Sequence, residues 1–82
     1  MSNRNHRTSF GRYLDRKAIN QAALSRATGI RPNRISEFAS KDCLKMRADE
    51  IYILAKAIHE DPCHLLEYIC KDIRLNRQEP GV

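Results

Sequence analysis

The sequence predicts an all-α protein built from five short helices, and three observations support this prediction. Apolar residues recur at i, i+3 and i+4 in successive segments, which is the spacing of one helix face. No segment of useful length alternates apolar and polar residues as a half-buried strand does. Residues that end or start helices, Gly29, Pro32 and the pair Asp61-Pro62, separate the segments. The chain of 82 residues has room for one domain with a small core.

The first predicted helix begins at Thr8 or Ser9, because either hydroxyl can accept a hydrogen bond from the first helical turn. It ends near Lys17, and Ala18 and Ile19 form the turn that follows. Its apolar face consists of Phe10, Tyr13 and Leu14.

The second and third helices lie close together in the sequence. Asn20 is a suitable N-cap for a helix over residues 21–28, and Gly29 can take the left-handed conformation that ends it. The inward residues of this helix are expected to be Ala23, Leu24 and Ala27. Pro32 fits the first turn of a third helix over residues 32–40, because its missing N–H is not needed there. The buried stripe of the third helix is Ile35, Phe38 and Ala39.

A polar loop over residues 40–46 leads to the fourth helix, and Leu44 and Met46 are expected to anchor it. The fourth helix covers residues 48–58, where Asp49 and Glu50 favour its positively charged N-terminus. Its apolar residues are Ile51, Leu54, Ala55 and Ile58.

The fifth helix starts at Asp61 and Pro62, which suit the N-cap and the first helical position. The apolar pattern extends this helix to Leu75. Its apolar side consists of Leu65, Leu66, Ile69 and Ile73.

These elements divide the chain into three parts. Residues 1–8 are polar, basic and without apolar periodicity, which predicts a flexible N-terminal arm whose Arg4, His6 and Arg7 can reach along a polyanion. Residues 9–75 hold the predicted helices and form the domain, and residues 76–82 form a C-terminal tail.

The net charge of +5 is distributed unevenly along the chain. Residues 1–41 hold nine Lys and Arg against two Asp and Glu, whereas residues 42–82 hold six against eight. The first half is therefore +7 and the second −2, which predicts a polyanionic partner for the first half. A merely solvated basic surface is the alternative.

The stretch NQAALSRATGIRPNRISEF contains two helices and a tight turn with a glycine. This is the arrangement of a helix-turn-helix motif, whose second helix projects from the surface and can enter the major groove of DNA. Small residues, Ala22, Ala23 and Ala27, allow the helices to approach closely. An ordinary αα corner has the same spacing and remains the alternative.

The same stretch resembles a known family, the phage-repressor and Cro type of helix-turn-helix domain. QAALSRATGI followed by RPNRISEF is similar to the family pattern Gln-x-x-Leu-Ala-x-x-x-Gly-Ile, polar residues, and Ile-Ser-x-Ile/Leu. MRADEIYILAKAIHEDPCHLLEYI resembles the continuation in a compact subgroup that ends in Asp-Pro-x-x-Leu-Leu-Glu-Tyr. The resemblance covers residues 10–69. It implies a lambda-repressor-like, five-helix domain that binds double-stranded DNA, typically as a dimer on a partly palindromic operator, and acts as a transcriptional repressor.

The resemblance also places residues at DNA-contacting positions. The expected base contacts are Arg31, Asn33, Arg34 and Glu37. Arg can pair with guanine, Asn with an adenine edge, and a carboxylate with cytosine N4. Both arginines can equally bind phosphate, and Glu37 can instead hold an arginine in place. Backbone contacts are expected from the start of the second helix and from flanking basic side chains: Asn20, Gln21, Arg12, Arg16, Lys41 and Lys45.

Three positions depart from the family pattern. Ala18 stands where the family often has glycine, so we expect a strained or differently built turn. Arg31 stands where Ser or Thr is common, so we expect the third helix to lack a side-chain cap. Pro32 replaces a polar base-reading residue and can offer a base only apolar contact.

The cysteines and histidines do not form a recognisable metal or catalytic motif. No C-x-x-C pair exists, and the Asp61-Pro62 break separates His59 from Cys63, so we expect no metal and no cofactor. Cys63 and Cys70 share a helical face, which leaves a thiol sensor as an alternative. Neither a nucleotide-binding loop nor an acid/base pair is visible, so we expect no enzyme activity.

We expect a homodimer because the fifth helix offers more apolar surface than a small core can cover. The expected interface residues are Leu66, Ile69, Cys70 and Ile73. No signal peptide or membrane span is visible, which predicts a cytoplasmic protein with reduced cysteines and no membrane partner. A protein-interaction module of the same fold, such as an antitoxin or anti-repressor with a protein partner, is the alternative function.

Overall fold

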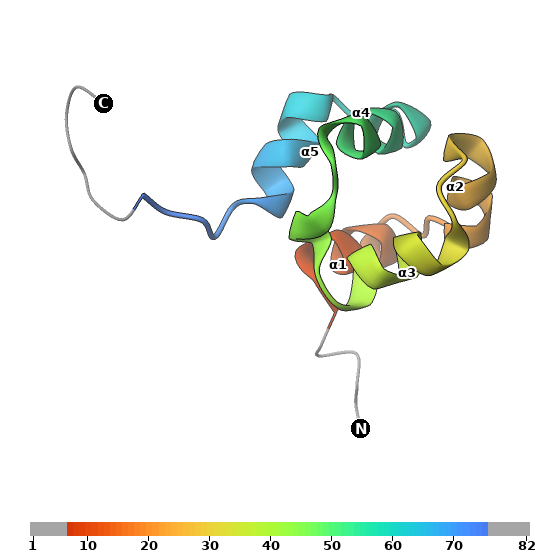
Figure 1. The fold of residues 1–82 in the computed structure, drawn as a ribbon, viewed down its shortest axis with the longest axis horizontal. Helices are drawn as coiled ribbons and strands as arrows, with labels where there is room; N and C mark the ends of the chain where they lie inside the picture. The colour runs from red at the N-terminus through yellow and green to blue at the C-terminus, as the bar shows by residue number, and fades with distance from the viewer. Residues whose placement is uncertain (1–6, 76–82) are drawn as a thin grey trace.

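The computed structural model describes residues 7–75, and this part of the chain contains five α-helices, one 3-10 turn and no β-strand (Figure 1). The elements in order are α1 (Ser9–Arg16), α2 (Gln21–Thr28), α3 (Pro32–Ser40), η2 (Cys43–Lys45), α4 (Ala48–Ala57) and α5 (Pro62–Ile69). The predicted all-α fold of five short helices is confirmed.

Three of the helices begin with a side-chain N-cap, as expected. Thr8, Asn20 and Asp61 each accept a backbone N–H of the following turn through a side-chain oxygen, at 3.0, 3.0 and 2.8 Å. Arg31 is the N-cap residue of α3 and makes no side-chain cap, which confirms the consequence expected from its departure from the family pattern. Pro32 occupies the first turn of α3, where no N–H is required.

α1 packs closely against α3. The two helices approach so closely at Gly11 that a Cβ there would lie 2.0 Å from the carbonyl oxygen of Ala39. The N–H of Thr8 donates to the same oxygen at 3.0 Å, and the Thr8 hydroxyl donates to the carbonyl of Phe38 at 2.6 Å. The end of α3 is therefore fixed to the start of α1. The largest fully buried side chains of the described residues form the centre of the core: Phe10, Leu14, Ile35, Phe38, Leu54 and Leu65.

Hydrogen bonds fix the turn between α2 and α3. Gly29 takes the left-handed conformation with φ of 80°, as expected. The hydroxyl of Ser25 donates to the carbonyl of Ile30 at 2.5 Å, and the N–H of Ile30 donates to the hydroxyl of Thr28 at 3.2 Å. Because side chains of α2 hold the backbone that leads into α3, the two helices form one helix-turn-helix unit.

Within residues 7–75, Ala18 and His59 also take the left-handed conformation although they are not glycines. Ala18 has φ of 57°, which confirms the strained turn expected after α1. His59 has φ of 62° and follows the end of α4. Such a conformation costs roughly 1 kcal/mol for a residue with a Cβ.

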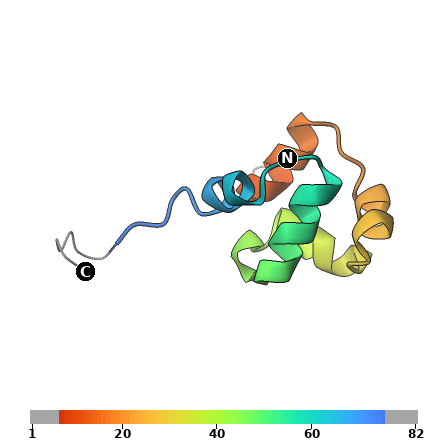
Figure 2. The ribbon, with the colours of Figure 1, turned by 90° about the horizontal axis from the view of Figure 1, so that it is seen from above.

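The expected inward face of α2 is wrong at two positions. Leu24 is buried, but Ala23 and Ala27 are exposed. α2 lies at the edge of the domain (Figure 1 and Figure 2), so only one row of its side chains reaches the core. The methyl groups of Ala23 and Ala27 line a shallow hollow against the end of α4.

The anchor expected at Leu44 is also wrong. Leu44 is 53% exposed, whereas Cys43 and Met46 are buried. The cause is local, because the Asp42 carboxylate accepts the N–H of Leu44 at 2.9 Å and starts η2. The turn directs Cys43 inward, where its Sγ lies 3.7 Å from the hydroxyl of Ser9.

The predicted extension of α5 to Leu75 is wrong, because the helix ends at Ile69. Residues 70–75 run away from the other helices in both views (Figure 1 and Figure 2). Ile73 is 58% exposed and Leu75 is 76% exposed. A short helix needs a surface on which to pack its apolar face, and the exposed Ile73 and Leu75 have none.

The predicted N-terminal arm and C-terminal tail fall mainly outside the described residues. Residues 1–6 of the arm and the whole tail, 76–82, are not described. The last two arm residues contact the domain: Thr8 caps α1, and the Arg7 guanidinium pairs with the Asp15 carboxylate at 2.8 Å.

Candidate nucleic-acid interface

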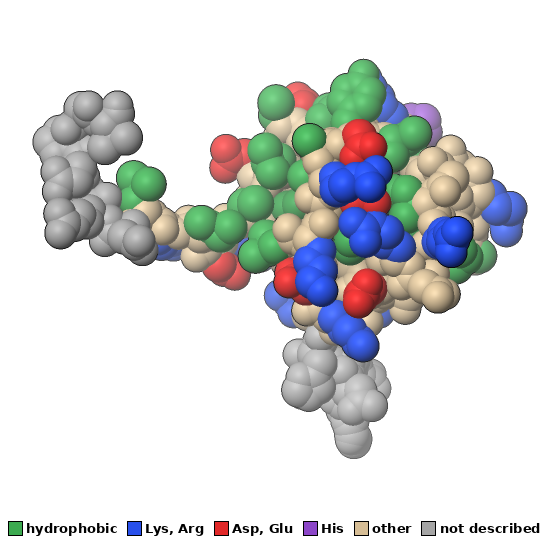
Figure 3. All heavy atoms as spheres, viewed as in Figure 1, with side chains coloured by type: hydrophobic (Ala, Val, Ile, Leu, Met, Phe, Trp, Pro, Cys, Tyr) green, Lys and Arg blue, Asp and Glu red, His purple; other side chains and the backbone are tan. Residues whose placement is uncertain are grey.

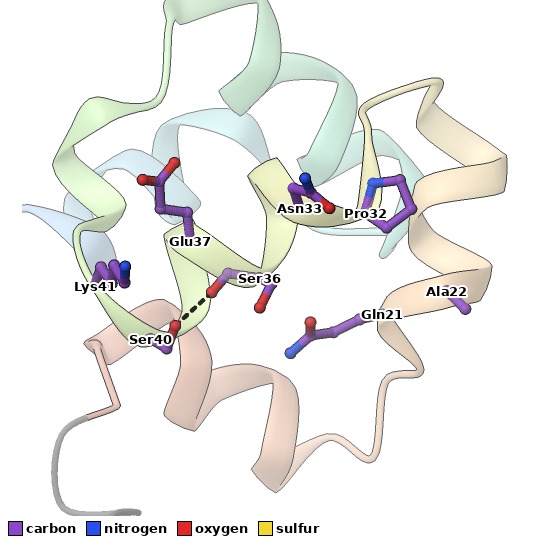
Figure 4. Close-up of a pocket in the computed structure, with 8 residues that line it drawn as sticks. All are labelled: Gln21, Ala22, Pro32, Asn33, Ser36, Glu37, Ser40 and Lys41. Carbon is purple, nitrogen blue, oxygen red and sulfur yellow. Dashed lines mark hydrogen bonds between the residues drawn. The ribbon is translucent and has the colours of Figure 1, made fainter.

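The exposed side of α3 and the start of α2 form an open groove (Figure 4). Its lining residues are Gln21, Ala22, Pro32, Asn33, Ser36, Glu37, Ser40 and Lys41. The structure thus brings together four residues that were expected at the DNA, namely Gln21, Asn33, Glu37 and Lys41. In Figure 4, Gln21 extends from α2 toward the side of α3 that carries Ser36.

Polar side chains in this groove are not engaged by the rest of the domain. Those of Gln21, Asn33, Ser36 and Glu37 make no hydrogen bond to any other residue within 7–75. Asn33 and Ser36 are exposed, and Gln21 and Glu37 are half-buried. These amide, hydroxyl and carboxylate groups are the ones that recognise base edges in the major groove. Their hydrogen-bonding capacity is available to a ligand.

Sequence reasoning missed Ser36 and Ser40 as groove residues. Asn33, Ser36, Glu37 and Ser40 follow one another at i, i+3, i+4 and i+7, so they form the stripe opposite the buried one. This spacing was the signal that could have identified both serines. Ser40 contributes mainly to the shape of the groove, because its hydroxyl donates to the carbonyl of Ser36 at 2.7 Å.

A second hollow lies on the other side of α3, between the helix-turn-helix turn and the start of α4. Its lining residues are Thr28, Gly29, Ile30, Arg31, Arg34, Arg47, Asp49, Glu50 and Ile53. Three arginines therefore meet at one end of α3, and two carboxylates lie among them.

Arg34 is engaged by Glu50 of α4. Its Nε donates to one carboxylate oxygen at 2.5 Å and its Nη2 to the other at 2.9 Å. The Glu50 side chain is only 7% exposed, and the hydrogen bonds from Arg34 hold the pKa of Glu50 below its usual value, against the effect of burial. The same bonds raise the pKa of Arg34. Its guanidinium also lies 4.9 Å from the centre of the Phe38 ring.

The other basic residues of this side have exposed side chains. The Arg31 side chain makes no hydrogen bond or ion pair with another residue of the described chain. Arg47 pairs with Asp49 at 3.0 Å, but both side chains are about two-thirds exposed. Lys41 and Lys45 are exposed in the connection from α3 to α4. Figure 3 shows Lys and Arg side chains gathered over α3 and this connection.

Arg12 and Arg16 of α1, two of the residues expected to contact the DNA backbone, do not line the groove. Arg12 donates to the backbone carbonyl of Arg7 at 2.7 Å. The Arg16 guanidinium lies 5.7 Å from the centre of the Tyr13 ring and 5.9 Å from that of Tyr68, on the side where α1 meets α5. Neither arginine lines the two hollows beside α3.

At the start of α2, the Asn20 side chain is used within the helix, since it accepts the N–H of Ala23. The N–H groups of the first turn of a helix have no partner inside the helix, so those of Gln21 and Ala22 can face a phosphate oxygen. Asn20 thus fixes the start of α2 through its side chain.

The four residues expected at a dimer interface differ in exposure. Leu66 is 46% exposed, Ile73 is 58% exposed, and Cys70 is half-buried. Ile69 is 6% exposed and belongs to the core of the domain, so it offers little surface to a second copy. Leu66 borders a shallow apolar groove between α4 and α5, whose other lining residues are Ala48, Ile51, Tyr52, Pro62 and Cys63.

The sequence also raised the questions of metal ligands, membrane spans and reactive thiols. Nowhere in residues 7–75 do three or more His, Cys, Asp or Glu side chains gather as metal ligands would. Each helix in the range is too short or too polar to cross a bilayer. Cys43 is buried, Cys63 exposed and Cys70 half-buried, and all three are free thiols.

Comparison with known proteins agrees with this geometry. The family model of the Cro/C1-type HTH DNA-binding domain matches residues 11–71, which include all five helices except the first two residues of α1. No curated protein and no solved structure matches the chain. The matched range contains the helix-turn-helix unit, the groove beside α3 and the basic residues around it. The chain belongs to the Cro/C1-type helix-turn-helix DNA-binding domain family.

Proposed function

We propose that the protein is a sequence-specific transcriptional regulator that acts as a dimeric repressor and reads the major groove of double-stranded DNA with α3. One observation carries the proposal. Side chains that suit base edges lie unpaired along the free side of α3, and basic side chains flank them. The basic side chains hold the phosphate backbone, and the polar stripe reads bases.

The groove suggests a division of roles among its residues. Asn33 pairs with an adenine edge, Glu37 accepts a hydrogen bond from cytosine N4, and Ser36 pairs with either kind of group. Pro32 contacts a thymine methyl group. Gln21 contacts a phosphate or an outer base from the start of α2. Arg31 contacts a guanine or a phosphate from the second hollow, at the start of α3.

The phosphate contacts come from two parts of the chain. The start of α2, from Asn20 to Gln21, contacts one strand. Lys41, Lys45 and Arg47, which lie in the connection from α3 to α4, contact the other. Arg47 was not expected from the sequence, and its place beside Arg31 in the second hollow is what adds it.

Dimerisation would place two copies of α3 about 34 Å apart, one turn of DNA, on a partly palindromic site. Leu66, Cys70 and Ile73 supply exposed apolar surface for this contact. Occupying promoter DNA blocks transcription. The protein acts in the cytoplasm, where its target DNA is accessible.

Selection of bound sequences from a random DNA pool at about 0.1 M salt tests the proposal. We expect enrichment of one motif, and an affinity for it that falls steeply as salt rises. The double variant Asn33→Ala/Glu37→Ala should lose preference for the motif, whereas Glu67→Ala on α5 serves as a matched control and should keep it. A wild-type protein that enriches no motif would rule the proposal out.

The second candidate function is a protein-interaction module. The apolar groove between α4 and α5 favours it, since Tyr52 and Leu66 are 56% and 46% exposed there. This function predicts capture of a protein partner that Leu66→Asp abolishes, together with no DNA preference.

A further inference from the structure

We propose that Arg34 is a positioning residue, which together with Glu50 fixes the recognition helix α3 to α4 and does not itself contact DNA. This inference rests on the proposed function, because it assigns a role in DNA reading to a residue of the same site. It differs from the role expected from the family resemblance, in which Arg34 contacts a base.

The first observation is the way in which Glu50 joins α3 to the start of α4. One carboxylate oxygen accepts Nε of Arg34 at 2.5 Å, and the other accepts both Nη2 of Arg34 at 2.9 Å and the backbone N–H of Arg47 at 2.8 Å. A side chain of α3 and the backbone N–H of Arg47, the N-cap residue of α4, thus meet on one buried carboxylate. Two parallel N–H···O bonds fix the orientation of the guanidinium as well as its distance.

The second observation is that α3 and α4 have other main neighbours. α3 packs on α1, α2 and η2, and α4 packs on α2 and α5. Neither helix is a main packing partner of the other. The pair Arg34–Glu50 therefore connects two elements that are otherwise joined mainly through their neighbours, and it lies next to the residues proposed to hold phosphate, Arg31 and Arg47.

The third observation is that Glu50 would lose its ion-pair partner if Arg34 turned toward DNA. The Glu50 side chain is 7% exposed, and the nearby Arg47 side chain is directed to Asp49 through two hydrogen bonds at 3.1 and 3.0 Å. Releasing Arg34 would leave a buried carboxylate without its ion-pair partner, which is strongly unfavourable. Arg34 also covers the Phe38 ring, a contact that it would lose. If the Arg31 side chain turned toward DNA, it would leave no buried carboxylate of the described residues without its ion-pair partner.

The test compares three variants of the full chain. Arg34→Met removes the arginine and leaves Glu50 unpaired. Arg34→Met/Glu50→Met removes both charges, keeps the net charge, and lets two side chains of similar length pack between the helices. Arg31→Met removes a neighbouring arginine that we assign to DNA. Thermal unfolding followed by circular dichroism establishes that each variant is folded at the temperature of the binding assay.

The expected results separate positioning from contact. Arg34→Met should lower the affinity for the selected DNA site about 10-fold, and the double variant should recover to within about 3-fold of wild type, since contacting residues are coupled over this range. The double variant should keep the wild-type base preferences and the wild-type slope of log affinity against log salt. Arg31→Met should keep the fold and reduce that slope by about one if it holds a phosphate.

Three results of the binding assay would overturn the inference. Loss of preference at one base position in the double variant would show that Arg34 reads that base, and a slope reduced by about one would show that it holds a phosphate. Unchanged affinity in Arg34→Met would show that the pair does not position α3. If Arg34→Met is unfolded, Glu50→Gln replaces it, because the glutamine oxygen can still accept the Arg47 N–H.

A readout without DNA keeps this inference distinct from the proposed function. Amide hydrogen exchange in α3 should be faster in Arg34→Met than in the wild type and should return toward the wild-type rate in the double variant. Equal rates in all three proteins would overturn the positioning role. A wild-type protein that binds no preferred DNA sequence would instead overturn the proposed function and leave the exchange result standing.

Discussion

Replacement of Gly11 by alanine tests the contact that holds α3 in place. A Cβ at Gly11 would lie 2.0 Å from the carbonyl oxygen of Ala39, 2.9 Å from its carbonyl carbon and 3.2 Å from its Cα. All three atoms are backbone, so no side chain can rotate away. α1 and α3 must separate, and the two hydrogen bonds from Thr8 to the carbonyls of Ala39 and Phe38 must lengthen.

The magnitude follows from these contacts. Overpacking of a core costs about 1–3 kcal/mol. Weakening the two hydrogen bonds of Thr8 costs about 1 kcal/mol each. Alanine in place of glycine in a helix returns up to about 1 kcal/mol. The net destabilisation of Gly11→Ala is therefore about 2–4 kcal/mol, which lowers Tm by at least about 10 °C in a domain of this size.

Urea unfolding followed by circular dichroism measures this loss, with Gly29→Ala as the matched control. A Cβ at Gly29 meets no atom within 4 Å. The Gly29→Ala variant is therefore destabilised only because alanine must adopt the left-handed conformation, with φ of 80°, which costs roughly 1 kcal/mol. A Gly11→Ala protein as stable as wild type, or more stable than Gly29→Ala, would refute the close contact between α1 and α3.

Two further predictions concern the electrostatics and the capping of the domain. Because Arg34 holds the pKa of Glu50 below its usual value, the folded state gains stability from this pair above the usual pKa of about 4.5 and loses it as pH falls through the lower folded-state value. The urea midpoint of the wild type should therefore fall more between about pH 5 and pH 3 than that of Glu50→Gln, and parallel curves would argue against the pair. Asp61→Ala removes the cap of α5 and should cost about 1 kcal/mol in urea unfolding, whereas Asp72→Ala, after the helix, should cost nothing measurable.

The features of the fold that could be predicted from the sequence are those that depend on neighbouring residues. The starts of α2, α3 and α5 follow from Asn20, Pro32 and Asp61, because a cap acts on the turn next to it. The strained conformation of Ala18 was expected from the residue that the family often has there. The three-residue and four-residue spacing of apolar side chains identified most of the core.

The features that were missed depend on partners far away in the sequence. Glu50 was expected only to favour the start of α4, but its main partner, Arg34, lies 16 positions earlier on another helix. The end of α5 depends on how far the rest of the domain extends beside it as a packing surface. The apolar pattern through Ile73 does not indicate where that surface ends. The choice of Cys43 over Leu44 as the buried residue depends on the single turn that Asp42 starts.

The same distinction applies to the candidate site. Asn33 and Glu37 could be assigned to the exposed stripe of α3 from helical spacing, and the groove contains both. Whether the amide of Asn33 and the carboxylate of Glu37 are free to bind a ligand could not be predicted. It depends on whether other residues of the domain form hydrogen bonds or ion pairs with them. Arg34 shows the difference, since its sequence position resembles that of a base contact while its guanidinium is bound to Glu50.

Binding to single-base variants of the selected DNA site tests the central claim most directly. Wild-type protein, Asn33→Ala and Glu37→Ala are each titrated against the full set of variants at one salt concentration. If α3 reads bases, each substitution removes about 1–3 kcal/mol of discrimination at its own position in each half-site and leaves the other positions unchanged. A loss of affinity that is equal at every position, or no loss at all, would contradict the assignment of this face of α3 to base reading.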